Sequence, residues 1–398
     1  MSRLSALEAS PGKPGSTPKI HAPSVDLSEA ARTVVLAHRA APAATVAAAL
    51  RMGDRFLYGA GAAGRLWPSE DAPLATVDTP FDLASVTKPV TALAMARLER
   101  AGALSRKEAL ADALPALAKT VSARVPLNLF AAHRAGLEGH GPLYEALVHG
   151  GSVDPEEALV TAANARRAEC AGDPPDEGFA PVYSDLGYLL VGAALARRSG
   201  VEVDEVMTRE VLGPLGLAIG SARAMRARDA SFDARVAPTE IVPFRGGLVR
   251  GVVHDENAFA VGGDGACGHA GLFGDALSVA RLGVALLEVL GGERSEWLTP
   301  NDLAPLLRPR PGGTLLAGFD GRSDDAPSSG ARLGPRTFGH LGFTGTSLWI
   351  DPDAGFVGVL LTNRVHPTRT ALAIRQARPA AYDAMYDAMV AARVAESG

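Results

Sequence analysis

The stretch FDLASVTKPVTALAMARLERAG, residues 81–102, places a serine, a lysine and a proline just ahead of an amphipathic apolar run. A proline within a helix lacks an N–H donor and collides with the carbonyl four residues back, so a helix tolerates it only in the first turn. Pro89 therefore predicts that a helix begins near Ala84 or Ser85. Lys88 then lies one turn from Ser85 on the same face, with Cβ atoms about 5–6 Å apart.

Two interpretations of Ser85 follow from this position. A serine at a helix start can simply cap the helix. Alternatively, a lysine that has lost its proton can deprotonate the hydroxyl, and the helix dipole then favours the alkoxide and the later oxyanion. Only five of the 39 basic residues are lysines, at positions 13, 19, 88, 107 and 119. Because arginine cannot release its proton, a retained Lys88 favours the second interpretation over chance survival on a surface helix.

Composition excludes several classes of function. With 398 residues, 47% of them hydrophobic, the chain can bury a large core and is expected to form two lobes. Its 39 basic and 44 acidic residues leave no positive excess for nucleic acid or a membrane surface, and no uncharged apolar window is long enough to span a bilayer. We therefore expect neither partner.

The cysteines and the N-terminus indicate the compartment. Cys170 and Cys267 are too few for a disulfide framework, although one bridge between them is left open. Residues 1–25 are rich in Pro, Gly and Ser, lack the apolar region of a signal peptide and are expected to form a flexible arm. A cytoplasmic location follows.

The two ends of the chain have strand patterns and the middle has helical ones. We expect a helix over 26–39, a hairpin turning at Met52-Gly53-Asp54, and helical patterns from 89 to about 240, including 107–121, 154–169 and 186–200. A helix over 275–290 precedes strands at 337–343, 346–352 and 355–363. The last helix, about 370–394, is expected to be kinked or broken at Pro379.

This order predicts an α+β fold of two lobes, in which both chain ends build one antiparallel sheet flanked by helices. The sheet domain would comprise residues 26–88 and 310–398. An inserted, mostly helical domain with loops lining the cleft would comprise residues 89–309.

Two further segments carry groups suited to acyl chemistry. Tyr183 and Asp185, in PVYSDLGYLLVG, lie at the start of a helix, 98 residues after Ser85. A tyrosinate beside a lysine can act as a general base, although Tyr183 could also be a core aromatic. In FGHLGFTGTSLWIDP, Gly342 lets a substrate backbone approach the strand, and the N–H of Phe343 can complete an oxyanion hole with that of Ser85.

Together these segments resemble the serine β-lactamase-like and penicillin-binding-protein-like hydrolases, in the class C and esterase branch. The resemblance runs from Asp26 to Val394 and includes TPFDLASVTK, LNLFAAHRAGL, RGVVHDENAFAVGG, GHAGLFG, GTSLWIDP and LLTNRVHP. The resemblance implies a beta-lactamase/transpeptidase-like fold. It also implies that Ser85 is the acylated nucleophile, that Lys88 and Tyr183 are the coupled base and acid, and that His340 is the cation or hydrogen-bond donor. The residues that it places around the substrate are Asp185, Gly342, Phe343, Asn363 and Arg364.

Three positions depart from the family pattern. Asp185 stands where the family has asparagine, His340 where it has lysine, and Leu341 where it has threonine. All three changes weaken the hold on a substrate carboxylate. We therefore expect an esterase or a (D-)peptidase or amidase acting on small ester or peptide-like substrates. The alternatives are a true β-lactamase or DD-peptidase, and a non-catalytic sensor that is acylated or binds a peptide.

Other motifs carry little weight. GAGAAG at 59–64 and GDGACG at 263–268 match a dinucleotide fingerprint but lack the strand–turn–helix context, so no cofactor is expected. His254, His269 and Cys267 lack metal-ligand spacing, so no metal is expected. His254 and Asp255 are candidates for the cleft rim.

Overall fold

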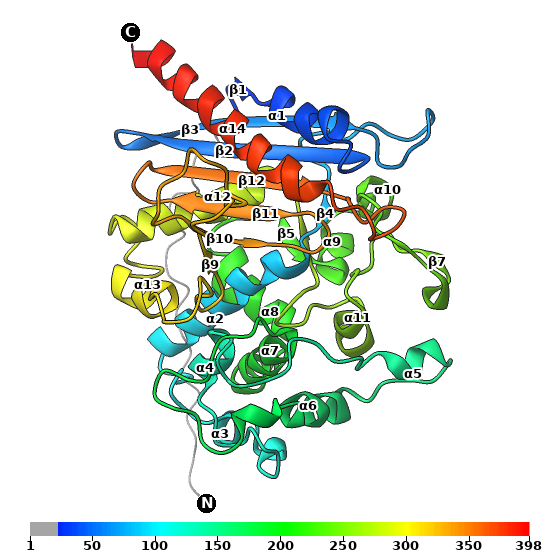
Figure 1. Cartoon of the computed structure of the whole chain (residues 1–398), viewed down its shortest axis with the longest axis vertical. Coiled ribbons are helices and arrows are strands. Elements are labelled where there is room, and N and C mark those ends of the chain that lie inside the picture. Colours follow the sequence, from blue (N-terminus) through cyan, green and yellow to red (C-terminus); the bar gives the residue numbers. More distant parts are fainter. Residues whose placement is uncertain (1–22, 398) are drawn as a thin grey trace, which may run out of the picture.

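A computed structural model describes residues 23–397, and most of the arm expected over 1–25 lies outside the described residues. A seven-stranded sheet occupies the upper half in Figure 1, and helices and loops occupy the lower half. The strands lie in the order β1 (Val25–Asp26), β3 (Arg55–Gly64), β2 (Ala43–Met52), β12 (Phe356–Thr362), β11 (Ser347–Asp351), β10 (Phe338–Leu341) and β9 (Asp320–Gly321). All neighbours are antiparallel except that β1 runs parallel to β3. Strands from the two chain ends meet where β2 pairs with β12, with Val46 opposite Leu360. The sheet predicted from both termini is confirmed.

The central hairpin consists of β2 (Ala43–Met52) and β3 (Arg55–Gly64), joined at Gly53, whose φ of 62° suits glycine. Side chains alternate along β2, so that Ala47 and Ala49 join one apolar cluster while Val46 and Ala48 join another. Both faces of β2 are therefore buried, which explains its almost unbroken run of small apolar residues.

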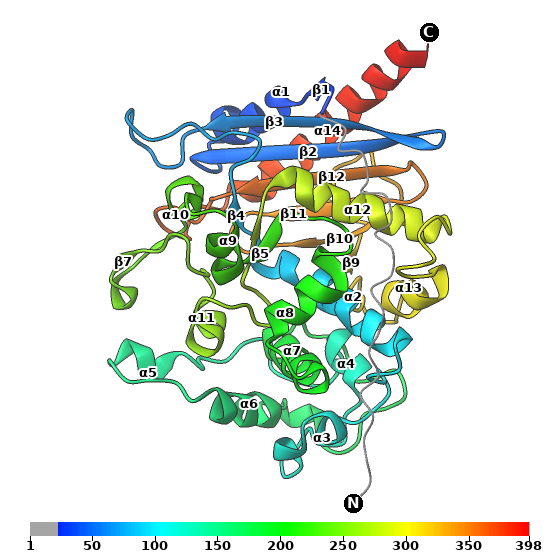
Figure 2. The same cartoon turned by 180° about the vertical axis from the view of Figure 1, so that it is seen from behind.

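Helices cover both faces of the sheet. Figure 1 shows α14 (Ile374–Ser397) in front of the sheet, and Figure 2 shows α12 (Ala276–Leu290) in front of the opposite face. The closing helix thus begins at Ile374 rather than 370, and it continues through Pro379 instead of breaking there. Although α12 lies within the 89–309 segment, it packs on β2 and β12 and belongs with the sheet.

The lower half is helical, as expected, but less regular over 107–121. That segment forms only α3 (Leu110–Ala113) and one 3₁₀ turn (Pro115–Leu117), because Pro115 lies two residues after the end of α3 and cannot continue it. The strong patterns at 154–169 and 186–200 give α6 (Pro155–Asn164) and α7 (Asp185–Ser199). The other elements are α1 (Ser28–Arg32), β4 (Phe81–Asp82), α2 (Thr87–Arg100), α4 (Leu127–Ala131), α5 (Glu145–Val148), α8 (Val203–Met207), β5 (Ile219–Ser221), α9 (Ala222–Arg228), α10 (Phe232–Arg235), β6 (Ile241–Val242), β7 (Gly247–Leu248), α11 (Glu256–Gly262), β8 (Leu272–Gly274) and α13 (Pro300–Leu307).

Candidate active site

Ser85 lies at the start of α2, within a 3₁₀ turn over Ala84–Val86. Pro89 is the third residue of α2, as the first-turn argument predicts. Neither helical segment has a side-chain cap, so Ser85 does not act as an N-cap. Its Oγ instead accepts a hydrogen bond of 2.9 Å from Nζ of Lys88. Ala84, directly before Ser85, has a φ of 48°, in the left-handed region that residues other than glycine rarely adopt.

Lys88 is fully buried, and its ammonium group has three acceptors. They are Oγ of Ser85 at 2.9 Å, Oδ1 of Asp185 at 2.7 Å and the carbonyl oxygen of His269 at 3.2 Å. Burial acts to lower the pKa of Lys88, but the Asp185 carboxylate and the nearby Tyr183 outweigh it and raise the pKa above its usual value. Lys88 is therefore charged in the resting protein.

Tyr183 precedes α7, and its ring centroid lies 4.8 Å from Nζ of Lys88. The ring also packs against His133, 4.7 Å away, and against His340, 5.9 Å away. Burial raises the pKa of the Tyr183 phenol above its usual value. The Lys88 charge and hydrogen bonding to Lys88 and Ser85 act to lower that pKa, but they do not outweigh burial. The resting phenol therefore keeps its proton.

His340 lies on β10 and is 4% exposed. Burial and the Lys88 charge lower the pKa of the imidazole to about 3, so the ring is neutral. Nδ1 lies 2.7 Å from the carbonyl oxygen of Leu341, which can only accept, so Nδ1 carries the hydrogen and Nε2 is a free acceptor. His340 therefore does not supply the cation considered for this position.

Gly342 brings the end of β10 close to the segment before Ser85. A Cβ at Gly342 would collide first with the hydroxyl of Thr346 and would also lie 2.7 Å from the carbonyl oxygen of Leu83. Thr346 also donates to that carbonyl, at 2.9 Å. The absence of a side chain at Gly342 thus makes room for Thr346 and for the Leu83 carbonyl, and the predicted approach of a substrate to this glycine stays a prediction. The N–H of Phe343 next to it has no acceptor among residues 23–397.

The Phe343 side chain is 48% exposed and stacks on His254, with ring centroids 5.8 Å apart. The Arg364 guanidinium lies 4.7 Å from the centroid of the Phe343 ring and donates to the Phe343 carbonyl at 2.8 Å. Nε2 of His254 lies 2.9 Å from the Glu240 carboxylate, which also accepts from Arg369. Arg364 and His254 thus hold the Phe343 ring in place beside the site.

The predicted substrate contact Asn363 and the neighbouring Leu341, which departs from the family pattern, both lie apart from this group. Asn363 is 1% exposed, and its amide bonds only to backbone groups of Ala43, Leu66 and Pro238. It is therefore not available to a substrate. Leu341 packs against the apolar cluster beneath α14, because alternate residues of β10 face opposite sides of the sheet.

The structure adds two histidines that sequence reasoning did not assign to the site. His133 packs on Tyr183, and its Nδ1 accepts from the N–H of Ser184 at 3.0 Å, so its Nε2 carries the ring hydrogen. Its pKa is held well below the usual range by burial and by the Lys88 charge. His269 offers its carbonyl to Lys88 and its Nε2 to Asp255 at 2.9 Å. His133 lies in LNLFAAHRAGL and His269 in GHAGLFG, two of the segments that carry the family resemblance. That resemblance is the sequence feature that could have pointed to both histidines.

The motifs that we set aside have ordinary structural roles. GAGAAG lies within β3, where Gly61 allows the α1 segment to approach, and GDGACG follows α11 in a loop. Cys170 and Cys267 are buried, free thiols. Between residues 23 and 397 we find no group of three or more His, Cys, Asp or Glu placed to hold a metal ion, and no helix long and apolar enough to cross a membrane.

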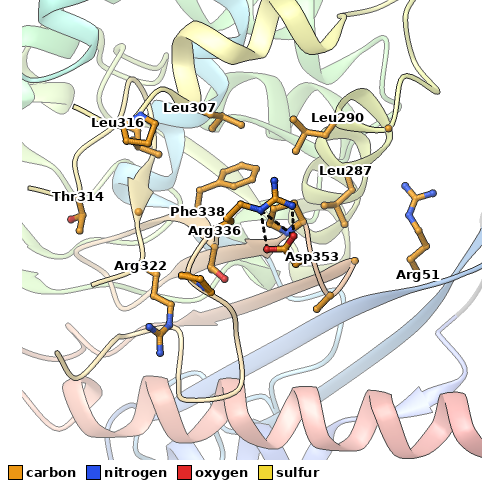
Figure 3. Close-up of a pocket in the computed structure, with 18 of the residues that line it drawn as sticks. Arg51, Leu287, Leu290, Leu307, Thr314, Leu316, Arg322, Arg336, Phe338 and Asp353 are labelled. Carbon is orange, nitrogen blue, oxygen red and sulfur yellow. Dashed lines mark hydrogen bonds and ion pairs between the residues drawn. The ribbon is translucent and has the colours of Figure 1, made fainter. Parts of the chain in front are cut away.

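A separate cavity of about 1090 Å³ lies near the far end of β10. Figure 3 shows Phe338, Leu287 and Leu307 around it and the Arg336–Asp353 ion pair within it. None of the candidate site residues lines this cavity.

The fold and the serine–lysine pair define a class of hydrolases related to penicillin-binding proteins. The family model described as Beta-lactamase matches residues 35–382, and the chain belongs to this family. A protein named "Putative D-alanyl-D-alanine carboxypeptidase" from Escherichia coli K12 is 26% identical over 317 residues, covering 73% of this chain and 70% of that protein.

Solved structures share the fold. EstCE1, titled "a hydrolase with promiscuous acyltransferase activity", has a TM-score of 0.66 at 21% identity. The match covers 89% of this chain and 97% of the EstCE1 chain. A penicillin-binding protein homologue from Caulobacter crescentus has a TM-score of 0.63 at 22% identity, and the match covers 91% of this chain and 97% of that one.

Proposed function

We propose that the protein hydrolyses small ester or amide substrates through a covalent acyl-enzyme on Ser85. The contact of 2.9 Å between Nζ of Lys88 and Oγ of Ser85 carries the proposal, with Tyr183 as the third member of the group. Oγ would attack the substrate carbonyl, and the N–H groups of Ser85 and Phe343 would stabilise the oxyanion. Tyr183 would return a proton to the leaving group, and water would release the acyl group.

The charges of the site support a neutral or N–H-bearing substrate over an anionic one. His340 is neutral, and Arg364 donates to the carbonyls of Phe343, Arg369 and Ala371. The Asp185 carboxylate points one oxygen at Lys88, and the other lies 4.0 Å from Nδ1 of His140. This arrangement supports esterase or D-amino-acyl peptidase activity, in line with the names of the relatives, and it disfavours β-lactams, which carry a carboxylate.

The test is hydrolysis of a short-chain aryl ester beside a chromogenic cephalosporin, together with fluorophosphonate labelling. We expect the ester to be turned over faster. Ser85→Ala should abolish turnover and labelling, and Lys88→Arg should lower both by at least about 100-fold, because arginine cannot accept the serine proton.

Lys119→Arg, at an exposed lysine, is the matched control and should behave like the parent protein. Full activity in Lys88→Arg would contradict the proposed base. Fast cephalosporin turnover without ester turnover would contradict the substrate class, and labelling without turnover would point to a sensor.

A further inference from the structure

Lys88 cannot deprotonate Ser85 in the state that the structure shows. Its three N–H groups have three acceptors within 3.2 Å, which leaves no lone pair on Nζ. Because Ser85 accepts from this ammonium group, its own hydrogen points elsewhere. A base role for Lys88 requires that one of its protons first goes to another group.

The neighbours of Lys88 leave a single suitable acceptor. Those that face it are Tyr183, Tyr188, Asp185, His133, His340, Asp255 and the carbonyl of His269. The phenols are protonated, and a carbonyl does not take a proton. Asp255 binds His269 and the N–H of Ala258. Of these groups, the Asp185 carboxylate is the one anion hydrogen-bonded to Lys88.

The two neutral imidazoles are poorer proton acceptors. Nδ1 of His133 already accepts from Ser184, and the opposite ring nitrogen carries its hydrogen. His340 has a free Nε2, but burial and the Lys88 charge lower the pKa of its ring to about 3, so it resists protonation.

The first turn of α7 holds Asp185 in position. The N–H of Asp185 donates to the carbonyl of Gly139 at 2.9 Å, and Ser184 caps the helix by accepting from Gly187 at 3.2 Å. The Asp185 side chain is 20% exposed, and its second oxygen lies 4.0 Å from His140. One oxygen therefore faces the buried amine while the other is nearer to solvent.

Resting on the proposed function, we propose that Asp185 activates Lys88 by taking one of its protons, so that Ser85, Lys88 and Asp185 form a proton relay. Asp185 acts through Lys88 and is thus a positioning residue. An asparagine amide at this position could not accept a proton, so this step requires the carboxylate.

The protons balance in each step. One Nζ–H bond of Lys88 breaks and its proton goes to Oδ1 of Asp185, which converts the ion pair to an amine and a carboxylic acid. The Oγ–H proton of Ser85 then goes to the Nζ lone pair as Oγ bonds to the carbonyl carbon. When the bond to the leaving group breaks, Lys88 gives a proton to that group through the Tyr183 hydroxyl, and Asp185 returns its proton to Lys88.

The test is the rate of fluorophosphonate labelling of Ser85 from about pH 5 to pH 10. Fluoride leaves without a proton, and no natural substrate is needed, so the rate reports on activation of the nucleophile. The parent protein should keep a nearly constant rate above about pH 6. In Asp185→Asn, Lys88 loses the charge that holds its pKa up, so burial should lower that pKa. The labelling rate of this variant should lie below the parent's at low pH and rise about tenfold per pH unit until Lys88 has lost its own proton.

Two variants complete the design. Asp185→Glu keeps a carboxylate and should keep the flat profile at a lower rate. Asp255→Asn removes a second negative charge near Lys88 without removing a hydrogen bond to it, and should also keep the flat shape. Thermal melting checks that each variant is folded.

The outcomes are distinct. An Asp185→Asn profile that is flat, uniformly lowered or raised at every pH overturns the relay, as does a pH-dependent profile in Asp185→Glu. Failure of the parent protein to label above the Ser85→Ala background overturns the proposed function instead.

Discussion

At the scale of single residues, the site combines the Lys88–Asp185 ion pair with two buried histidines, His133 and His340, whose pKa values are lowered. His340 is 4% exposed, and its pKa falls from a usual 6.5 to about 3. The unfolded chain therefore binds a proton at this position between those two values, while the folded protein does not. Stability from the neutral ring is complete above about pH 6.5 and is lost as the pH falls below it.

His340→Asn should reduce this acid sensitivity. Asparagine can donate to the Leu341 carbonyl as Nδ1 does, but it does not titrate. Between about pH 6 and pH 4 the free energy of unfolding of the variant should fall less steeply than that of the parent, by up to about 1.4 kcal/mol per pH unit.

Urea denaturation at a series of pH values measures these slopes. His149→Asn, at an exposed histidine, is the control and should leave the slope unchanged. Equal slopes in His340→Asn and the parent protein would mean that the ring is already protonated when folded.

At the scale of elements, the geometry of the proposed oxyanion hole depends on the end of β10, which lies against the segment before α2. The loop after Gly342 is tied to that segment by Thr344, which donates to the Asp82 carbonyl at 2.8 Å, and by Thr346, which donates to that of Leu83. A methyl group on Gly342 would collide with the Thr346 hydroxyl and with the Leu83 carbonyl, and so would displace the hydrogen bond that joins the two segments.

Gly342→Ala should therefore slow labelling of Ser85 by about 100-fold, because the Phe343 N–H would move away from the oxyanion position. Gly141→Ala is the matched control, since an added Cβ there meets only ordinary contacts at 3.7 Å and more. Unchanged labelling in a folded Gly342→Ala protein would show that this close approach does not set the oxyanion geometry.

The sequence predicts elements best where local chemistry is decisive. Pro89 places the start of α2, and Gly53 places the hairpin turn. The spacing of Ser85 and Lys88 follows from helix geometry alone. The Lys88–Asp185 contact could not be read from spacing, because it joins the starts of two helices whose packing the sequence does not state. The burial of Asn363 could not be read from the sequence for the same reason, since burial is a property of the whole fold.

At the scale of the whole molecule, the site depends on a sheet that the two chain ends complete. The helix α14 covers one face of β2 and β12 and buries Tyr382, Met385 and Met389 in the cluster beneath it. The site residues on β10, α2 and α7 belong to other elements. The closing helix should therefore govern whether the protein folds, without altering the chemistry of each folded molecule.

Met385→Ala tests this separation. Met385 is fully buried, so its truncation should lower the free energy of unfolding by about 2–5 kcal/mol. Met385→Leu nearly conserves the volume and should cost less than about 1.5 kcal/mol. Labelling of Ser85 per folded molecule should be the same in both variants, because the site groups on α2 and α7 lie outside that cluster and β10 reaches it only through Leu341. A slower rate in folded Met385→Ala protein would mean that packing beneath α14 reaches the site through the sheet.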